Sequence, residues 1–106
     1  MIPDVDNDSV AYLNGEFVRL GDAKVSVLDR GFIFGDSIYD VVPVYGGTPF
    51  RMDGHLARLR RSLESVRIDT GWTLSQWEAL VFELIARGTP KNGDCLVYVQ
   101  VTRGVA

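Results

Sequence analysis

The hydrophobic positions along this chain first repeat every two residues, as in strands, and later about every 3.6 residues, as in helices. Near the N-terminus, Asn14 and Gly15 separate the short runs VAYL and EFVRL. Both residues tolerate a positive φ, so the pattern predicts a hairpin with a two-residue turn. Apolar and polar residues also alternate in AKVSVL, residues 23–28, which predicts a strand with one buried face.

The next segment, DRGFIFGD at residues 29–36, follows neither period. It is too irregular for a helix and too rich in glycine for a plain strand, so we expect an irregular turn. Gly31 and Gly35 would allow tight backbone bends. Asp29, Arg30 and Asp36 would hold the segment in place through hydrogen bonds and charge pairs.

A strand is expected over residues 38–45, followed by a glycine-glycine turn and the short partner run TPFRM, which together make a second hairpin. Pro43 has no N–H to donate, so it is expected at a sheet edge or a bulge. Because side chains alternate between faces, Tyr39 and Val41 share one face and could line a pocket, while Asp40 and Val42 face the other way. The alternative for Tyr39 is an ordinary packed strand aromatic.

Two amphipathic helices are expected next. The first, over residues 52–68, has Asp53 as its expected N-cap. Its apolar stripe consists of Leu56, Leu59, Leu63 and Val66, and a polar set lies beside it: His55, Arg58, Ser62 and Ser65. The second begins at Ser75, with a capping box to Glu78, and ends at Gly88 and Pro90.

A long alternating strand over residues 95–102 follows the helices. Strands, two helices and a further strand indicate an α+β fold, an antiparallel-rich sheet with a pair of helices packed on it. Residues 1–106 make one domain of this kind. The chain ends soon after the strand, without a polar tail, so we expect a fragment of a longer protein.

Composition narrows the possible partners. The chain is 46% hydrophobic and 24% charged, with a net charge of -3, as in an ordinary globular domain. The acidic balance argues against nucleic acid and membrane surfaces, and the first residues do not resemble a secretory signal, so a cytoplasmic protein is expected. One cysteine and one histidine make a weak case for a metal, so no metal site is expected. Cys95 is interpreted as a buried strand residue rather than a catalytic thiol.

Arg58 is the most interesting candidate for binding chemistry. It lies off the apolar stripe among small polar neighbours, where its guanidinium could hold a phosphate or carboxylate bidentately. The alternative is a solvent-facing helix arginine such as Arg60 or Arg61. His55 could act as an acid or base, but a lone histidine at a helix start is more often structural or solvated.

Three stretches together closely resemble the amino-terminal domain of class IV pyridoxal-phosphate aminotransferases: YLNGEFV, AKVSVLDRGFIFGDSIYDVV with the HLARL string after it, and YVQVTRGVA. Within that class the pattern is most similar to D-amino-acid aminotransferases, which carry DRG, an aromatic residue, FGDG and YEVV. Ser37 departs from a frequent glycine, which implies a less permissive backbone angle. Asp40 departs from the usual glutamate and shortens the carboxylate by one methylene.

The resemblance implies a full-length enzyme that moves an amino group between a D-amino acid such as D-alanine and a 2-oxo acid such as 2-oxoglutarate. The implied cofactor is pyridoxal 5'-phosphate, bound through its phosphate by Arg58, with Tyr39 and Val41 beside the substrate. A homodimer is also implied.

The same comparison implies that the catalytic lysine is missing here. Neither Lys24 nor Lys91 matches the lysine that forms the Schiff base, which is expected beyond Ala106. We therefore expect no catalytic residue in this chain and no activity from it alone. Aminodeoxychorismate lyase and branched-chain aminotransferase remain alternatives within the class, and a non-catalytic assembly module with the same fold is an alternative outside it.

Overall fold

The computed structural model describes residues 6–88 and 93–106, which form an α+β fold, as the sequence predicts. The elements in chain order are β1 (Val10–Leu13), β2 (Glu16–Arg19), the short 3-10 helix η1 (Leu20–Asp22), α1 (Arg30–Phe34), β3 (Ser37–Tyr45), β4 (Thr48–Pro49), α2 (Met52–Ser65), α3 (Leu74–Gly88) and β5 (Cys95–Thr102). The first hairpin forms a separate two-stranded sheet, and the second sheet has the strand order β4-β3-β5. Both sheets are antiparallel. Pro90, expected to help end the second helix, and Lys91 lie outside the described ranges.

The first hairpin, β1 and β2, confirms the prediction from its turn residues. Asn14 and Gly15 have φ angles of 49° and 93°, the positive values that this turn requires. Tyr12 and Phe17 are paired across the strands, and their rings meet edge to face with centroids 5.2 Å apart. Tyr12 also contacts Trp72, with ring centroids 6.2 Å apart, so the hairpin packs against the segment that joins the two long helices.

The strand expected over residues 23–28 is a wrong prediction. Ser26 instead organises a local turn, in which its hydroxyl accepts a hydrogen bond from the Leu28 N–H at 3.0 Å. Val25 and Val27 are both exposed, at 57% and 69%. A two-residue alternation becomes a strand only when a neighbouring strand takes its backbone hydrogen bonds, and no described strand pairs with these residues.

The segment expected to be an irregular turn contains the one-turn helix α1. Its first N–H groups are capped by Asp29, whose side chain accepts a hydrogen bond from Gly31 N at 2.8 Å. Gly35, with a φ of 66°, ends the helix in the left-handed conformation. A helix of five residues is too short to show a helical period, which explains why the sequence pattern does not reveal it.

The predicted contacts that hold this segment are present. Asp29 accepts a hydrogen bond from the Thr102 hydroxyl at 3.1 Å, and Asp36 pairs with Arg103 at 2.7 Å. Arg30 binds the backbone of residues 104 and 105 through its own N–H and its guanidinium. These contacts join the start of β3 to the end of β5.

β3 is the longest strand and is paired unequally on its two sides. β5 pairs with it over residues 37–44, whereas β4 pairs only with Val44 and Tyr45. Pro43 lies just where β4 stops, and its carbonyl accepts a hydrogen bond from the Phe50 N–H at 2.7 Å. The N–H that proline lacks would lie on this same side, so little ladder pairing is lost there, in agreement with the predicted edge position.

An N-cap at Asp53 would start α2 at residue 54, but the helix begins two residues earlier, at Met52, and it ends at Ser65, three residues before the expected end at 68. Its N-cap is Arg51, which has a φ of 52° and no side-chain capping bond. Asp53 therefore lies in the first turn and is not the N-cap. Its negative charge still suits the positive end of the helix dipole.

The capping box of α3 also differs from the prediction, because it involves Thr73 and Gln76 rather than Ser75 and Glu78. The Thr73 hydroxyl accepts a hydrogen bond from Gln76 N at 3.2 Å, and the Gln76 amide oxygen accepts one from Thr73 N at 2.8 Å. Both residue pairs fit the same sequence motif, so the motif alone does not decide between them.

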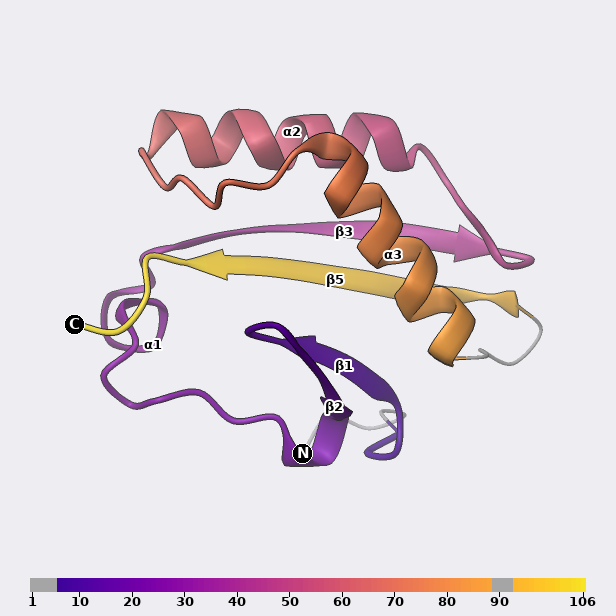
Figure 1. Cartoon of the computed structure of the whole chain (residues 1–106), viewed down its shortest axis with the longest axis horizontal. Helices are drawn as coiled ribbons and strands as arrows, with labels where there is room; N and C mark the ends of the chain where they lie inside the picture. The colour runs from indigo at the N-terminus through magenta and orange to yellow at the C-terminus, as the bar shows by residue number, and fades with distance from the viewer. Residues whose placement is uncertain (1–5, 89–92) are drawn as a thin grey trace.

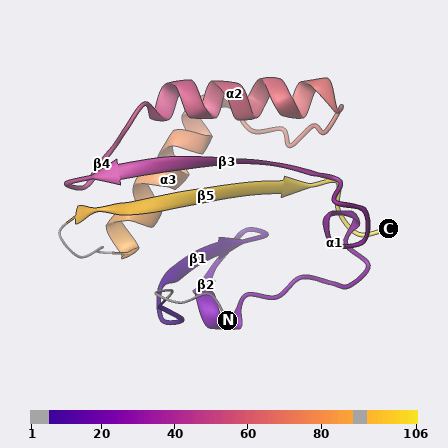
Figure 2. The same ribbon diagram turned by 180° about the vertical axis from the view of Figure 1, so that it is seen from behind.

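The core lies between one face of the β3–β5 sheet and the two long helices. α2 lies along β3, and α3 crosses in front of both strands in Figure 1 and behind them in Figure 2. The buried side chains are Val42, Val44, Leu56, Leu59, Leu63, Trp77, Val81 and Val97. Leu56, Leu59 and Leu63 of the predicted stripe of α2 therefore face the core, whereas Val66 is the C-cap of the helix and is not one of the core residues. No helix among the described residues is long and apolar enough to cross a bilayer.

Candidate functional site

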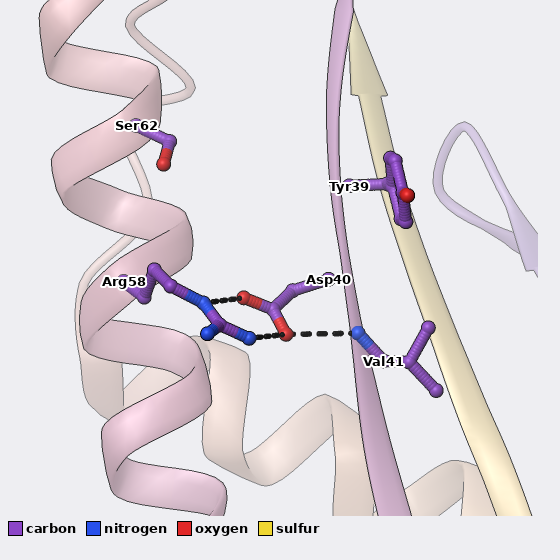
Figure 3. A pocket seen from close by; sticks show the side chains of 5 residues that line it. All are labelled: Tyr39, Asp40, Val41, Arg58 and Ser62. Carbon is purple, nitrogen blue, oxygen red and sulfur yellow. Dashed lines mark hydrogen bonds and ion pairs between the residues drawn. The ribbon is translucent and has the colours of Figure 1, made fainter.

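An open pocket of about 410 Å³ lies between α2 and β3. Its lining residues are Tyr39, Asp40, Val41, Arg58 and Ser62. In Figure 3, Arg58 reaches from α2 toward Asp40 on β3, while Tyr39 and Val41 project from the opposite side of the strand. The structure therefore brings the three predicted site residues, Arg58, Tyr39 and Val41, to one pocket.

The alternation of side chains along β3 explains this arrangement. Tyr39 and Val41 share one face, as predicted, and Tyr39 is 62% exposed. Asp40 points to the core face and is only 5% exposed. Near Asp40, β3 has β5 on one side and no described strand on the other, so residues from both faces can border one pocket.

Asp40 and Arg58, both of which line the pocket, form an ion pair. Nε of Arg58 donates a hydrogen bond to Oδ2 of Asp40 at 2.8 Å, and Nη2 donates one to Oδ1 at 2.8 Å. Such a bidentate contact is the strong, geometrically specific form of this interaction. The two side chains differ in burial, because that of Arg58 is 59% exposed and that of Asp40 is 4% exposed.

His55, on the same side of α2, completes the polar cluster. Its Nδ1 lies 2.9 Å from Oδ1 of Asp40 and 3.2 Å from Nη2 of Arg58. A carboxylate only accepts and a guanidinium only donates, so the shorter contact assigns a proton to Nδ1 that is donated to Asp40. Two N–H groups on Nη1 of Arg58 and one on Nη2 are then left without an acceptor among the described residues. We call these three groups the outer edge of Arg58.

Asp40 is a buried carboxylate whose hydrogen-bonding capacity is well used. It also accepts a hydrogen bond from the Val41 N–H at 2.9 Å. The hydrogen bond from Arg58 holds the pKa of Asp40 below its ordinary value, although burial acts in the opposite direction. The hydrogen bonds from His55 and Val41 lower this pKa further. Asp40 is therefore ionised at neutral pH, and it would be costly to leave this buried charge without its partner.

Arg58 is singled out by the sequence pattern, but its partner Asp40 is not. A signal was available, because Asp40 is the one charged residue on a strand face that otherwise carries Ile38, Val42 and Val44. An ionised group on such a face requires a partner. The polar side of α2 supplies that partner, since His55 and Arg58 are three residues apart and lie on one side of the helix.

On the exposed face of the sheet, ring stacking and side-chain hydrogen bonds join β3 to β5. The rings of Tyr39 and Tyr98 stack with centroids 5.5 Å apart. Tyr98 donates a hydrogen bond to the Gln100 side chain at 3.1 Å, and Gln100 donates one to the Ser37 hydroxyl at 3.0 Å. Ser37 lies in extended strand and not in the positive-φ region, so a serine in place of glycine is not strained here.

Cys95 and His55, the two other residues considered for chemistry, have surroundings that suit structural roles. Cys95 is half-buried in β5, where burial raises the pKa of its thiol and disfavours the reactive thiolate. His55 serves as a donor to Asp40. Across residues 6–88 and 93–106, no group of three or more His, Cys, Asp or Glu side chains could hold a metal ion.

The sequence of this chain matches a known protein family and several curated proteins. The model of the amino-transferase class IV family matches residues 37–106, which include the whole pocket. A D-alanine aminotransferase of Staphylococcus haemolyticus is 40% identical over 95 residues, which make up 90% of this chain and 33% of that protein. One from Bacillus licheniformis is 34% identical over 93 residues, 88% of this chain and 32% of that protein. The chain thus spans about a third of the length of these relatives.

Solved structures with the same fold are also aminotransferases. The branched-chain amino acid aminotransferase from Escherichia coli superimposes with a TM-score of 0.83 over 93% of this chain and 34% of that chain, at 22% identity. A fold IV transaminase from Curtobacterium pusillum superimposes with a TM-score of 0.75 over 85% of this chain and 32% of that chain, at 25% identity. Since the family model covers well over half of the sequence, this chain belongs to the class IV aminotransferases.

Proposed function

We propose that this chain is the amino-terminal domain of a transaminase that uses pyridoxal 5'-phosphate. The full-length enzyme would exchange an amino group between a D-amino acid such as D-alanine and a 2-oxo acid such as 2-oxoglutarate. The observation that carries this proposal is the 40% identity, over 90% of the chain, to a D-alanine aminotransferase. The branched-chain enzyme of similar fold shares 22% identity and supports no particular substrate.

Arg58 is the residue that would hold the phosphate of the cofactor. Its outer edge offers three N–H groups, its side chain is 59% exposed, and the adjoining pocket is open. Phosphate oxygens match the planar fork of a guanidinium bidentately, so the donor set fits this group. When bound, pyridoxal phosphate supplies the electron sink for the movement of the amino group.

Tyr39 and Val41 would form the wall beside the substrate. They share the face of β3 opposite Asp40, and stacking on Tyr98 limits the orientations of the Tyr39 ring. Tyr39 offers a hydroxyl that can bind a polar group of the substrate. Val41 offers an apolar contact that helps to exclude water from that side.

The domain would supply binding groups, whereas another part of the protein would supply the catalytic lysine. Lys24 is exposed on the segment before α1, and Lys91 lies outside the described residues. The relatives are about three times as long as this chain, so we place the lysine of the Schiff base outside residues 1–106. The chain alone would then be inactive. We also propose that the full-length enzyme is a cytoplasmic homodimer.

The complete gene product, purified and supplied with pyridoxal phosphate, tests this proposal. We expect pyruvate to form from D-alanine only when 2-oxoglutarate is present, with little pyruvate from L-alanine. Residues 1–106 produced alone should give none. Light scattering should report a dimer of the complete protein.

Other outcomes would replace the proposal. Pyruvate release from aminodeoxychorismate without an amino acceptor would assign a lyase. A preference for branched-chain L-amino acids would assign the other transaminase of the class. Failure of the complete protein to bind pyridoxal phosphate would favour a non-catalytic assembly module.

A further inference from the structure

We propose that Asp40 is a positioning residue for the phosphate site, where it fixes the guanidinium of Arg58 so that only the outer edge meets the phosphate. The proposal rests on the phosphate-binding role proposed for Arg58. It assigns the two edges of one guanidinium to two tasks, since Nε and one Nη2 hydrogen bind the protein and the remaining donors bind the ligand.

Asp40 has the rigidity that this role requires. Its side chain is 4% exposed, and it is held by the Val41 N–H at 2.9 Å and by His55 at 2.9 Å, both independent of Arg58. The carboxylate therefore has a defined position on the strand before Arg58 is considered. A group with fixed oxygens can impose one orientation on a planar fork.

Arg58, in contrast, is covered by packing only in part. Its side chain is 59% exposed, and its hydrogen-bonding contacts among the described residues are with Asp40 and His55. Without Asp40, this long side chain would adopt many rotamers, and a ligand would have to select one of them. By ordering the side chain beforehand, Asp40 lowers the entropy lost on binding.

The negative charge of Asp40 has the opposite effect on phosphate binding from its effect on the orientation of Arg58, so an experiment can separate the two. Asp40 offsets the positive charge of Arg58 and also repels a phosphate. If Asp40 acted only through its charge, its removal would strengthen phosphate binding. If it acts by orientation, its removal weakens phosphate binding, and this weakening persists in 1 M salt, where the Debye length is about 3 Å.

The experiment compares dissociation constants for pyridoxal phosphate and for pyridoxal, which lacks the phosphate, in the complete gene product. The dissociation constant for pyridoxal divided by that for pyridoxal phosphate isolates the contribution of the phosphate. A larger ratio means tighter binding through the phosphate. In 1 M salt we expect Asp40→Asn to reduce this ratio about fivefold, or about 1 kcal/mol at 1.4 kcal/mol per tenfold. Asp40→Glu restores a carboxylate and should recover most of the ratio. Asp53→Asn removes one charge from the first turn of the same helix and should leave the ratio unchanged.

Each outcome separates this inference from the proposal beneath it. If Arg58→Ala leaves the ratio unchanged, the phosphate-binding role of Arg58 is wrong. If Arg58→Ala lowers the ratio while Asp40→Asn leaves it unchanged or increases it in 1 M salt, the positioning role alone is wrong. A reduced ratio in Asp40→Asn with recovery in Asp40→Glu supports both.

A second variant decides the matter if Asp40→Asn does not fold. Arg58→Lys keeps a positive charge beside Asp40, so the buried carboxylate retains a partner, but lysine has no planar fork with two edges. We expect its ratio to fall close to that of Arg58→Ala. A ratio near that of the unmodified protein would show that an oriented guanidinium is not needed and would overturn the proposal.

Discussion

Replacement of Asp40 by asparagine should destabilise the folded protein at neutral pH by about 1–2 kcal/mol. The amide has the same shape and keeps one acceptor oxygen, but its NH2 group replaces an oxygen that now accepts from Arg58 or His55. An unmet buried polar group costs about 1–3 kcal/mol. The lower part of that range applies, because the exposed Arg58 side chain can bind water instead.

Urea unfolding followed by tryptophan fluorescence can measure this change, because Trp77 lies in the core. The effect must also depend on pH. The pKa of Asp40 is lowered in the folded state, so its stabilisation is complete above the ordinary aspartate pKa of about 3.9 and is lost as the pH falls through the lowered value. The difference between the unmodified protein and Asp40→Asn should therefore shrink below about pH 4.

Asp53→Asn is the matched control, since it removes an aspartate at the start of the same helix, and its stability should stay within about 0.5 kcal/mol of the unmodified protein. Equal stability of Asp40→Asn and the unmodified protein at pH 7 would contradict a stabilising role for the buried carboxylate. A difference that is the same at pH 7 and pH 3 would refute the assignment to the ionised carboxylate.

Three further substitutions test the surroundings of the site by urea unfolding. Gly31→Ala should cost about 1–3 kcal/mol, because its Cβ would overlap the Thr102 side chain; a neutral result would mean that this packing relaxes freely. Leu59→Ala should cost about 2–5 kcal/mol, since this side chain is fully buried, and a loss below 1 kcal/mol would contradict that burial. Ser37→Gly should cost about 1 kcal/mol through the lost bond from Gln100 and the added backbone freedom, and an increase in stability would contradict the contribution of that bond.

The long periodic elements could be predicted from the sequence because burial repeats along them. The leucines of α2 and the alternating residues of β5 show their core faces without any knowledge of their neighbours. The segment 23–28 shows the limit of that reasoning, because its alternation is not matched by a partner strand. α1 is too short to show a period, and its ends depend on Asp29 and Gly35.

Three residues of the candidate site, Arg58, Tyr39 and Val41, could be predicted from the sequence, but the ion pair between Asp40 and Arg58 could not. The polar position of Arg58 on α2 and the shared face of Tyr39 and Val41 follow from helical and strand periods. The pairing with Asp40 depends on how β3 and α2 meet in the folded chain, which no local pattern specifies. The buried carboxylate on an apolar face was the only local sign that a cation had to approach.

A structure of the complete gene product with pyridoxal phosphate bound would test the proposed phosphate site most directly. We expect a phosphate oxygen at hydrogen-bond distance, about 2.7–3.2 Å, from Nη1 or Nη2 of Arg58. Nε of Arg58 should remain on Asp40, and Tyr39 and Val41 should lie beside the amino-acid substrate. A phosphate bound elsewhere, with the Asp40–Arg58 pair facing only solvent, would contradict the proposed phosphate site.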